Sequence, residues 1–254
     1  MSGGEGRVVL VTGGTRGLGR GLVAAFSDNG DQVVTCGRKE PEPGSVAVPF
    51  FKCDVRDPDQ VAALVDEVFK QFGHIDVLIN NAGGTPYADT STMSPRLFER
   101  IVTLNLVAPF YVAQRANLVM QEQPGGGVII NIGSTAAKRP APNSAAYVAA
   151  KDGLVGLTRS LALEWAPKVR VILITPGLLR TEMVHEVYGD NVAAVEATVP
   201  MGRLATADEI GAMCVMMASP AAQFVTGSEI IIDGGGEVPA WVLAMQQAPD
   251  RQPQ

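Results

Sequence analysis

A tyrosine and a lysine stand four residues apart in a stretch of small side chains. The stretch NSAAYVAAKDG contains Tyr147 and Lys151. On a helix this spacing places both side chains on one face, so a phenol and an ammonium can share a pocket. A nearby ammonium favours the ionised phenol, which suits acid–base chemistry. The alternative is a core tyrosine beside a surface lysine, so the pair needs support from the rest of the chain.

A glycine-rich turn follows the first apolar run. The segment TGGTRGLGRG contains Gly13, Gly17 and Gly19. Glycines here let the backbone approach a pyrophosphate, and the helix that follows offers its N-terminus to the negative charge. The spacing differs from the G-x-G-x-x-G fingerprint, and a plain strand-to-helix connection is the alternative. The position after the first strand favours a dinucleotide site.

Two arginines lie where the second strand meets this turn. An acid at the end of that strand would accept hydrogen bonds from a ribose 2′-hydroxyl, whereas a cation accommodates a 2′-phosphate. The second strand ends in TCGRK, so Gly37 and Arg38 stand where an acid would otherwise select NAD(H). Arg16 lies inside the glycine turn. Because guanidinium groups pair bidentately with phosphate, we expect NADP(H) to be preferred over NAD(H). A solvated arginine on a loop is the alternative for each.

These residues lie among seven short β-branched runs that alternate with longer helical patterns. Strands this apolar are expected where helices cover both faces of a parallel sheet. The pattern predicts an α/β fold: one doubly wound Rossmann-type domain over residues 1–254, with a seven-stranded parallel sheet. Capping residues predict three helix N-termini, at Asp57-Pro58, at Ser94-Pro95 and at Thr206 with Glu209. The predicted strands lie within residues 7–14, 32–38, 46–54, 75–83, 127–134, 169–177 and 228–235.

Composition excludes several classes of protein. The 254 residues are 46% hydrophobic and 18% charged, with a net charge of −6 and a pI near 5.0, which argues against nucleic-acid binding. No secretory pattern or long apolar run is present, so we expect a cytoplasmic protein without membrane contact. The three cysteines, an odd number without CxxC spacing, are expected to be reduced core thiols, and no metal site is predicted.

Taken together, the motifs resemble those of the short-chain dehydrogenase/reductase family, in its form of roughly 250 residues that includes 3-oxoacyl-[acyl-carrier-protein] reductases. The resemblance covers nearly the whole chain. Single motifs such as Tyr-x-x-x-Lys arise by chance, but the ordered set is specific. It comprises Thr12-Gly13-x-x-x-Gly17-x-Gly19, Asp54-Val55, Asn80-Asn81-Ala82-Gly83, Asn105, Ser134, Tyr147-x-x-x-Lys151 and Pro176-Gly177 with Thr181.

The resemblance implies a catalytic set of Asn105, Ser134, Tyr147 and Lys151. Tyr147 is then the general acid in ketone reduction and the base in alcohol oxidation, and Lys151 stabilises its phenolate. Ser134 orients the substrate oxygen, with Thr135 as the neighbouring rival. Asn105 would kink its helix and hold a water in a proton relay, or alternatively bond locally as a buried polar group.

The resemblance also implies how the dinucleotide is held. Asp54 accepts a bond from the adenine amino group or, alternatively, caps local backbone, and Asn80 either braces the sheet or touches the cofactor. Pro176, Gly177 and Thr181 would seat the nicotinamide carboxamide. The full expected cofactor set is Gly13, Thr15, Arg16, Gly17, Leu18, Gly19, Arg38, Asp54, Val55, Asn81, Ala82, Gly83, Tyr147, Lys151, Pro176, Gly177 and Thr181.

Two segments are expected to serve substrate and assembly. Residues 178–201 resemble the family's substrate lid, with apolar residues that line a pocket or pack on the core; they are Met183, Val184, Val187, Tyr188, Val192 and Val195. Arg180 meets a substrate anion or water. The tail, at about residues 234–254, carries the apolar stretch Val238–Met245, expected to pack on a neighbouring subunit of a homotetramer, whereas residues beyond Gln246 look disordered.

The expected function is therefore an NADP(H)-dependent oxidoreductase that interconverts a ketone and a secondary alcohol by hydride transfer. The substrate is a small carbonyl compound or alcohol, and a 3-oxoacyl thioester, a hydroxysteroid-like ketone or a small cyclic ketone all fit. The alternative is a dinucleotide-sensing binding protein on the same fold. Such a sensor is expected to have lost one of the four catalytic residues, and all four are present.

Overall fold

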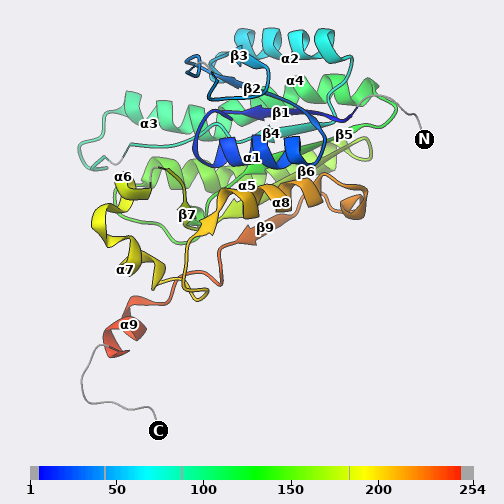
Figure 1. Ribbon diagram of the computed structural model, residues 1–254. Coiled ribbons are helices and arrows are strands. Elements are labelled where there is room, and N and C mark those ends of the chain that lie inside the picture. Colours follow the sequence, from blue (N-terminus) through cyan, green and yellow to red (C-terminus); the bar gives the residue numbers. More distant parts are fainter. Residues whose placement is uncertain (1–5, 43, 87, 183, 247–254) are drawn as a thin grey trace.

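Seven parallel strands form the centre of the protein, in a computed structural model that describes residues 6–42, 44–86, 88–182 and 184–246. Their order across the sheet is β3-β2-β1-β4-β5-β6-β9 (Figure 1). The chain winds outward from β1 in one direction and then returns to β4, so the winding reverses between β1 and β4. The strands are β1 (Val8–Thr12), β2 (Gln32–Gly37), β3 (Phe50–Lys52), β4 (Val77–Asn80), β5 (Gly127–Ile132), β6 (Val169–Pro176) and β9 (Glu229–Ile232). The sheet predicted from the sequence is confirmed.

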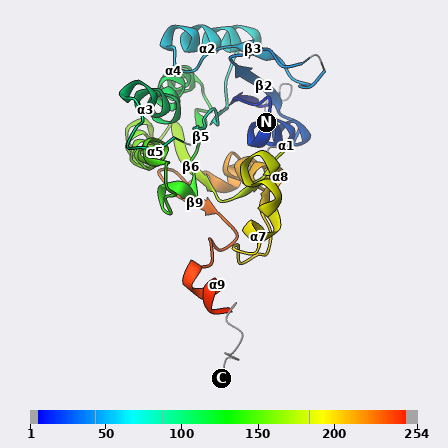
Figure 2. The same ribbon diagram turned by 90° about the vertical axis from the view of Figure 1, so that its left-hand side faces the viewer.

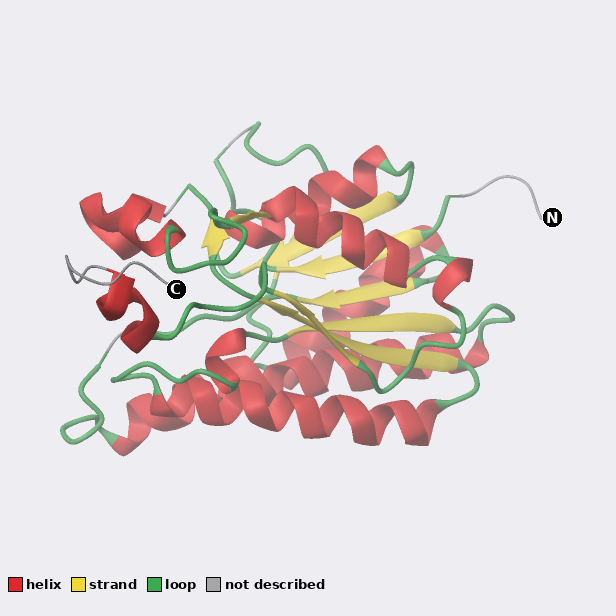
Figure 3. Cartoon of the chain, turned by 90° about the horizontal axis from the view of Figure 1, so that it is seen from below, coloured by secondary structure: helices red, strands yellow, loops and turns green. Residues whose placement is uncertain are grey.

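Helices cover both faces of this sheet, which explains why its strands are apolar throughout (Figures 2 and 3). In β1, Val8 and Leu10 pack toward one face, while Val9 and Val11 pack toward the other. The helices of the first face are α2 (Pro58–Phe72), α4 (Ala108–Glu122) and α5 (Ala145–Trp165), and those of the second face are α1 (Gly17–Asp28) and α8 (Ala207–Met217). The doubly wound arrangement is thereby confirmed.

The predicted helix starts are also present. The Asp57 side chain accepts hydrogen bonds from the first turn of α2, and Ser94 caps α3 (Pro95–Val102). Thr206 and Glu209 form a reciprocal capping box at α8. Each cap satisfies backbone N–H groups that have no partner inside the helix. These starts are encoded locally, so the sequence alone was sufficient to find them.

The chain beyond β6 leaves the sheet before it returns to β9. It forms strands β7 (Leu179–Arg180) and β8 (Ala205–Thr206), which pair in parallel, with helices α6 (Val184–Tyr188) and α7 (Val192–Glu196) between them. After β9, helix α9 (Ala240–Gln246) extends away from the rest of the protein (Figure 1). Its Trp241 side chain is 67% exposed. The predicted disorder beyond Gln246 lies outside the described residues.

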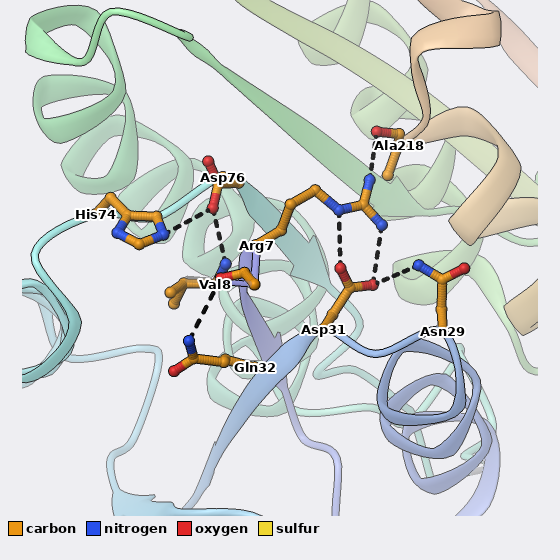
Figure 4. A network of polar contacts seen from close by, with 9 residues as sticks. Arg7, Val8, Asn29, Asp31, Gln32, His74, Asp76 and Ala218 are labelled. Carbon is orange, nitrogen blue, oxygen red and sulfur yellow. Dashed lines mark hydrogen bonds and ion pairs between the residues drawn. The ribbon is translucent and has the colours of Figure 1, made fainter. Parts of the chain in front are cut away.

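A polar network fastens the amino ends of the strands (Figure 4). The Arg7 guanidinium donates to both oxygens of Asp31, at 2.8 and 2.9 Å, and to the Ala218 carbonyl oxygen at 2.8 Å. Nearby, Asp76 accepts from the Val8 N–H at 2.7 Å and lies 3.3 Å from Nε2 of His74. Because this network lies at the end of the sheet opposite to the expected site, we assign it to stability.

Replacing Asp31 by asparagine is expected to lower the free energy of unfolding by about 2 kcal/mol, because the Asp31 side chain is only 4% exposed and receives a charged donor pair. Urea denaturation measures the change. Asp28→Asn, at an exposed position on α1, is the matched control and is expected to stay within about 0.5 kcal/mol. Equal stability of the two variants would contradict the assignment.

The three cysteines are free and buried, as the sequence predicts. A hydrogen bond between the Cys36 and Cys53 thiols raises the pKa of Cys36 and lowers that of Cys53. Burial raises the pKa of Cys214 to about 12. Within the described ranges, no helix has both the length and the apolarity to span a bilayer, and no three metal-ligating side chains gather.

Candidate active site

A cavity of about 540 Å³ opens at the carboxyl ends of the central strands. In parallel sheets this edge collects the residues that follow each strand, so segments far apart in the sequence meet there. The cavity wall includes Leu18 after β1, Asn81 and Gly83 after β4, Ser134 after β5, and Pro176 with Gly177 at the end of β6. Tyr147 and Lys151 complete it from α5.

The glycine turn after β1 leaves no room for side chains at Gly13 and Gly19. Gly13 has a φ of +69°, which disfavours any other residue. A Cβ atom on Gly19 would lie 2.1 Å from the Gly13 carbonyl oxygen. The Asn81 amide donates to the Thr12 and Gly13 carbonyl oxygens at 2.9 and 3.2 Å and so braces the turn. The result is a backbone cradle at the N-terminus of α1, the geometry that pyrophosphate binding requires.

Lys151 is a buried cation in the wall of the cavity. It is 5% exposed, its Nζ donates to the Ile132 carbonyl oxygen at 2.7 Å, and burial lowers its pKa to about 8. The same Nζ lies 5.8 Å from the centre of the Tyr147 ring. The phenol and the ammonium therefore share one pocket, as their spacing predicts, and the alternative of a solvated surface lysine is wrong.

Ser134 lies at the cavity wall where β5 ends. Its Oγ accepts the Ala136 N–H at 3.2 Å and caps a 3-10 turn over Thr135–Ala137. Because this bond uses the oxygen as acceptor, the hydroxyl proton stays available for a substrate oxygen. Thr135 also lines the cavity, but it is 5% exposed whereas Ser134 is half-buried. The geometry thus favours Ser134.

Asn105 lies in a π-helical turn, Thr103–Val107, between α3 and α4. Its amide nitrogen donates to the carbonyl oxygens of Ile101 and Gly84, both at 2.9 Å. Its Oδ1 accepts the Gly84 N–H at 2.9 Å. The side chain thereby clamps the loop after β4, which the sequence did not predict. The helix is distorted here into a π-helical turn, and both the kink and the water relay stay predictions.

Gly83 separates this asparagine from the lysine. A Cβ atom there would lie 2.8 Å from Oδ1 of Asn105 and 3.6 Å from Nζ of Lys151. Only a glycine therefore lets the loop after β4 pass between the two side chains. The neighbouring Asn80 donates to the Pro109 carbonyl oxygen at 3.0 Å and to Asn131 at 2.9 Å. Asn80 braces the sheet against α4, the first of the two roles expected for it.

At the other end of the expected dinucleotide site, the two arginines are exposed. Arg16 is the N-cap of α1, and Arg38 follows β2, which pairs with β1. Asp54 lies close enough to Arg38 for that guanidinium to contribute to lowering its pKa, although the main cause is Arg56. Arg56 donates to Asp54 through its backbone N–H at 3.1 Å and through Nε at 2.9 Å. Asp54 thus makes the local contacts foreseen as the alternative, and its contact with adenine stays a prediction.

The segment after β6 is fastened to the glycine turn by an acid that sequence reasoning missed. Glu182 accepts the Gly17 N–H at 2.7 Å and pairs with Arg20 at 3.0 Å. These contacts lower the pKa of Glu182. Its position directly after Thr181 was the available signal. Thr181 lines the cavity, so Glu182 holds the start of the expected lid against α1.

The structure shows what some of the remaining residues of the expected lid contact. Val184 and Tyr188 line the cavity, whereas Val184 and Val192 also pack together with Leu204. Pocket lining and core packing therefore both occur. Arg180 pairs with Glu196 at 2.5 Å and keeps 46% of its side chain exposed, so it does meet water, and its contact with a substrate anion stays a prediction. Met183 and the Val187 side chain lie outside what the structure describes.

Comparison with known proteins identifies the class. Residues 13–237 match the family profile described as enoyl-(acyl carrier protein) reductase. The chain is 34% identical to D-threitol dehydrogenase of Mycolicibacterium smegmatis, covering 91% of this chain and 93% of that protein. It is 32% identical to the 3-oxoacyl-[acyl-carrier-protein] reductase FabG of Escherichia coli, covering 91% and 97%. The chain belongs to the short-chain dehydrogenase/reductase family and is an oxidoreductase of that family.

Solved structures agree with this assignment. The ligand-free aldohexose dehydrogenase of Thermoplasma acidophilum superimposes with a TM-score of 0.87 at 32% identity, covering 98% of both chains. One relative is much longer: the chain is 37% identical to the uncharacterized short-chain type dehydrogenase/reductase y4vI of Sinorhizobium fredii but spans 47% of its length. The relatives act on different substrates, so family membership fixes the class of chemistry and the nicotinamide dinucleotide, not the substrate.

Proposed function

We propose that the protein is an NADP(H)-dependent oxidoreductase that interconverts a ketone and a secondary alcohol, with Tyr147 as general acid and base. The observation that carries the proposal is the shared pocket of Tyr147 and Lys151, open to the cavity beside Ser134. A buried ammonium near a phenol lowers the cost of forming phenolate, which is the state a general base requires. Ser134 then orients the substrate oxygen toward Tyr147.

The residues present fit a dinucleotide. The turn at Gly13 and Gly19 has no side chain that would keep a pyrophosphate away from the backbone at the N-terminus of α1, and a Cβ at Gly19 would collide with the turn. The Gly17 N–H, which now donates to Glu182, would be one donor to the pyrophosphate once Glu182 is displaced. Pro176, Gly177 and Thr181 line the cavity near the catalytic pair and would hold the nicotinamide end. When bound, the dinucleotide supplies or accepts the hydride. Tyr147 gives or takes the proton at the substrate oxygen.

The preference for NADP(H) rests on Arg16 and Arg38. Both are exposed at the carboxyl ends of the adjacent strands β1 and β2. Replacing Arg38 by alanine is expected to raise the KM for NADPH about tenfold and to leave the KM for NADH nearly unchanged, because only NADPH carries the 2′-phosphate. Oxidation of both dinucleotides, followed by absorbance with one ketone substrate, measures the ratio.

Arg159→Ala, at an exposed position on α5, serves as the control for removal of a surface arginine. It is expected to change neither KM. A wild-type enzyme with a lower KM for NADH than for NADPH would overturn the cofactor proposal. The same assay, run over a panel of ketones, tests the function itself.

We further propose that the chain assembles as a homotetramer. Large apolar side chains are exposed on α4, α5, the edge strand β9 and α9; they are Leu118, Leu163, Ile231 and Trp241. Apolar side chains that are exposed on the outer helices and on an edge strand support an interface between subunits. Light scattering is expected to give four times the 26.6 kDa of one chain. A monomer would contradict the proposal, and with it the packing of Val238–Met245 on a neighbour.

A further inference from the structure

Three charged side chains form a cluster beside the candidate active site, outside the catalytic set. Nη2 of Arg139 donates to Oδ2 of Asp233 at 2.7 Å, and Nε of Arg139 lies 3.6 Å from Oε1 of Glu237. Arg139 and Glu237 line the cavity. Arg139 follows β5 and the two acids follow β9, so the strand ends bring them together.

The cluster is held in place by backbone. The Gly235 N–H donates to Oδ1 of Asp233 at 3.2 Å. A Cβ atom on Gly236 would lie 2.8 Å from Nη1 of Arg139, and one on Gly177 would lie 2.7 Å from Cβ of Asp233. The peptide backbone therefore passes close to both side chains, while the Arg139 side chain stays 38% exposed. The planar guanidinium is oriented by its two carboxylate partners and presents its donors in a fixed geometry.

The charge of the cluster selects among substrates. Within the cluster, one guanidinium and two carboxylates leave one net negative charge, whereas the Lys151 ammonium lines the catalytic part of the same cavity. An anionic group placed against the cluster would therefore be repelled, and an apolar group there would strip water from Glu237 without replacing its hydrogen bonds. Hydroxyl groups satisfy both partners, since they donate to a carboxylate and accept from a guanidinium.

We propose that Arg139 and Glu237 are specificity-determining residues that recognise an uncharged, polyhydroxylated small molecule, a polyol or its keto form. This inference rests on the proposed function, because the carbinol that reacts must lie at Ser134 and Tyr147 while neighbouring hydroxyls reach the cluster. Thr135 and Thr198 also line this cavity, and their hydroxyl oxygens can accept hydrogen bonds from a polyol. The nicotinamide end of the dinucleotide would fill part of the cavity of about 540 Å³, which leaves room for a short substrate.

The test compares three sets of five-carbon alcohols: the pentitols xylitol, ribitol and arabitol, the matching aldonates, and pentan-3-ol. The wild-type enzyme is expected to oxidise its best pentitol with a kcat/KM at least about tenfold above the aldonate and pentan-3-ol. In Glu237→Gln, the ratio of kcat/KM for the pentitol to kcat/KM for the aldonate is expected to shrink about tenfold, because one repelling charge is lost. Glu164→Gln, an exposed acid on α5 bonded to Ser160, is the matched control and should keep the wild-type ratio.

A preference of the wild-type enzyme for the aldonate or for pentan-3-ol would overturn the inference. So would an equal effect of Glu237→Gln on all three sets. A binding measurement separates this inference from the proposed function. With dinucleotide present, pentitols are expected to raise the Tm of the wild-type protein and to lose this effect in Glu237→Gln. If pentitols raise the Tm of the wild-type protein but are not turned over, the proposed function alone is contradicted. If no pentitol raises the Tm, the inference is overturned.

Discussion

Replacing Tyr147 by phenylalanine is expected to lower kcat about a thousandfold while leaving the dissociation constant of the dinucleotide within about twofold of wild type. The variant keeps the ring that packs near Lys151, whose Nζ lies 5.8 Å from the ring centre, and removes only the hydroxyl. Without this hydroxyl, the substrate oxygen loses the group that is proposed to exchange a proton with it. Steady-state kinetics and calorimetric titration of the dinucleotide measure the two quantities.

A matched substitution controls for the general effect of losing a phenol. Tyr111→Phe removes a hydroxyl from α4, where the ring lies 6.3 Å from that of Phe110, centre to centre, and where it lines no part of the cavity. This variant is expected to keep nearly wild-type kcat. A Tyr147→Phe enzyme with more than a tenth of the wild-type kcat would rule out the proposed role.

The second large effect is expected at Lys151, where activity and stability should move in opposite directions. Lys151→Met is expected to lower kcat about a hundredfold or more, because the phenolate loses its neighbouring ammonium. The same variant should be more stable at pH 7. Burial lowers the pKa of Lys151 from 10.5 to about 8, a folding cost on the order of 3 kcal/mol for the charged form.

Part of the gain in stability of Lys151→Met is offset by the loss of a hydrogen bond. The bond from Nζ to the Ile132 carbonyl oxygen is lost, which costs about 1 to 2 kcal/mol. A net rise of about 1 kcal/mol in the free energy of unfolding is therefore expected, and urea denaturation measures it. Lys168→Met is the control, since this exposed lysine also donates to a backbone carbonyl oxygen, that of Gln123 at 2.8 Å. It should change neither activity nor stability appreciably.

The same pKa shift predicts how stability depends on pH. Between about pH 8 and 10.5, the unfolded chain still binds the Lys151 proton while the folded protein has released it. Stability therefore rises with pH across this window in the wild-type protein. The Lys151→Met variant should lack this rise. A wild-type curve parallel to that of the variant would show that the buried ammonium carries no such cost.

The amino-acid sequence by itself determined the sheet, the starts of α2, α3 and α8, and the pairing of Tyr147 with Lys151. Each depends on residues close together in the chain. Apolar runs fix the strands, one capping side chain fixes a helix start, and a spacing of four residues fixes one helix face. The order in which the motifs follow one another along the chain also indicated the family.

Other features were decided only by the tertiary structure. Glu182 accepts a hydrogen bond from the Gly17 N–H at the start of α1, and Arg180 pairs with Glu196. Arg139 meets Asp233 and Glu237 because β5 and β9 end at the same edge of the sheet. A charged side chain has many possible partners of opposite sign in the sequence. Which partner it finds is fixed only when the strands bring distant loops together, because charge pairing depends on distance in space rather than along the chain.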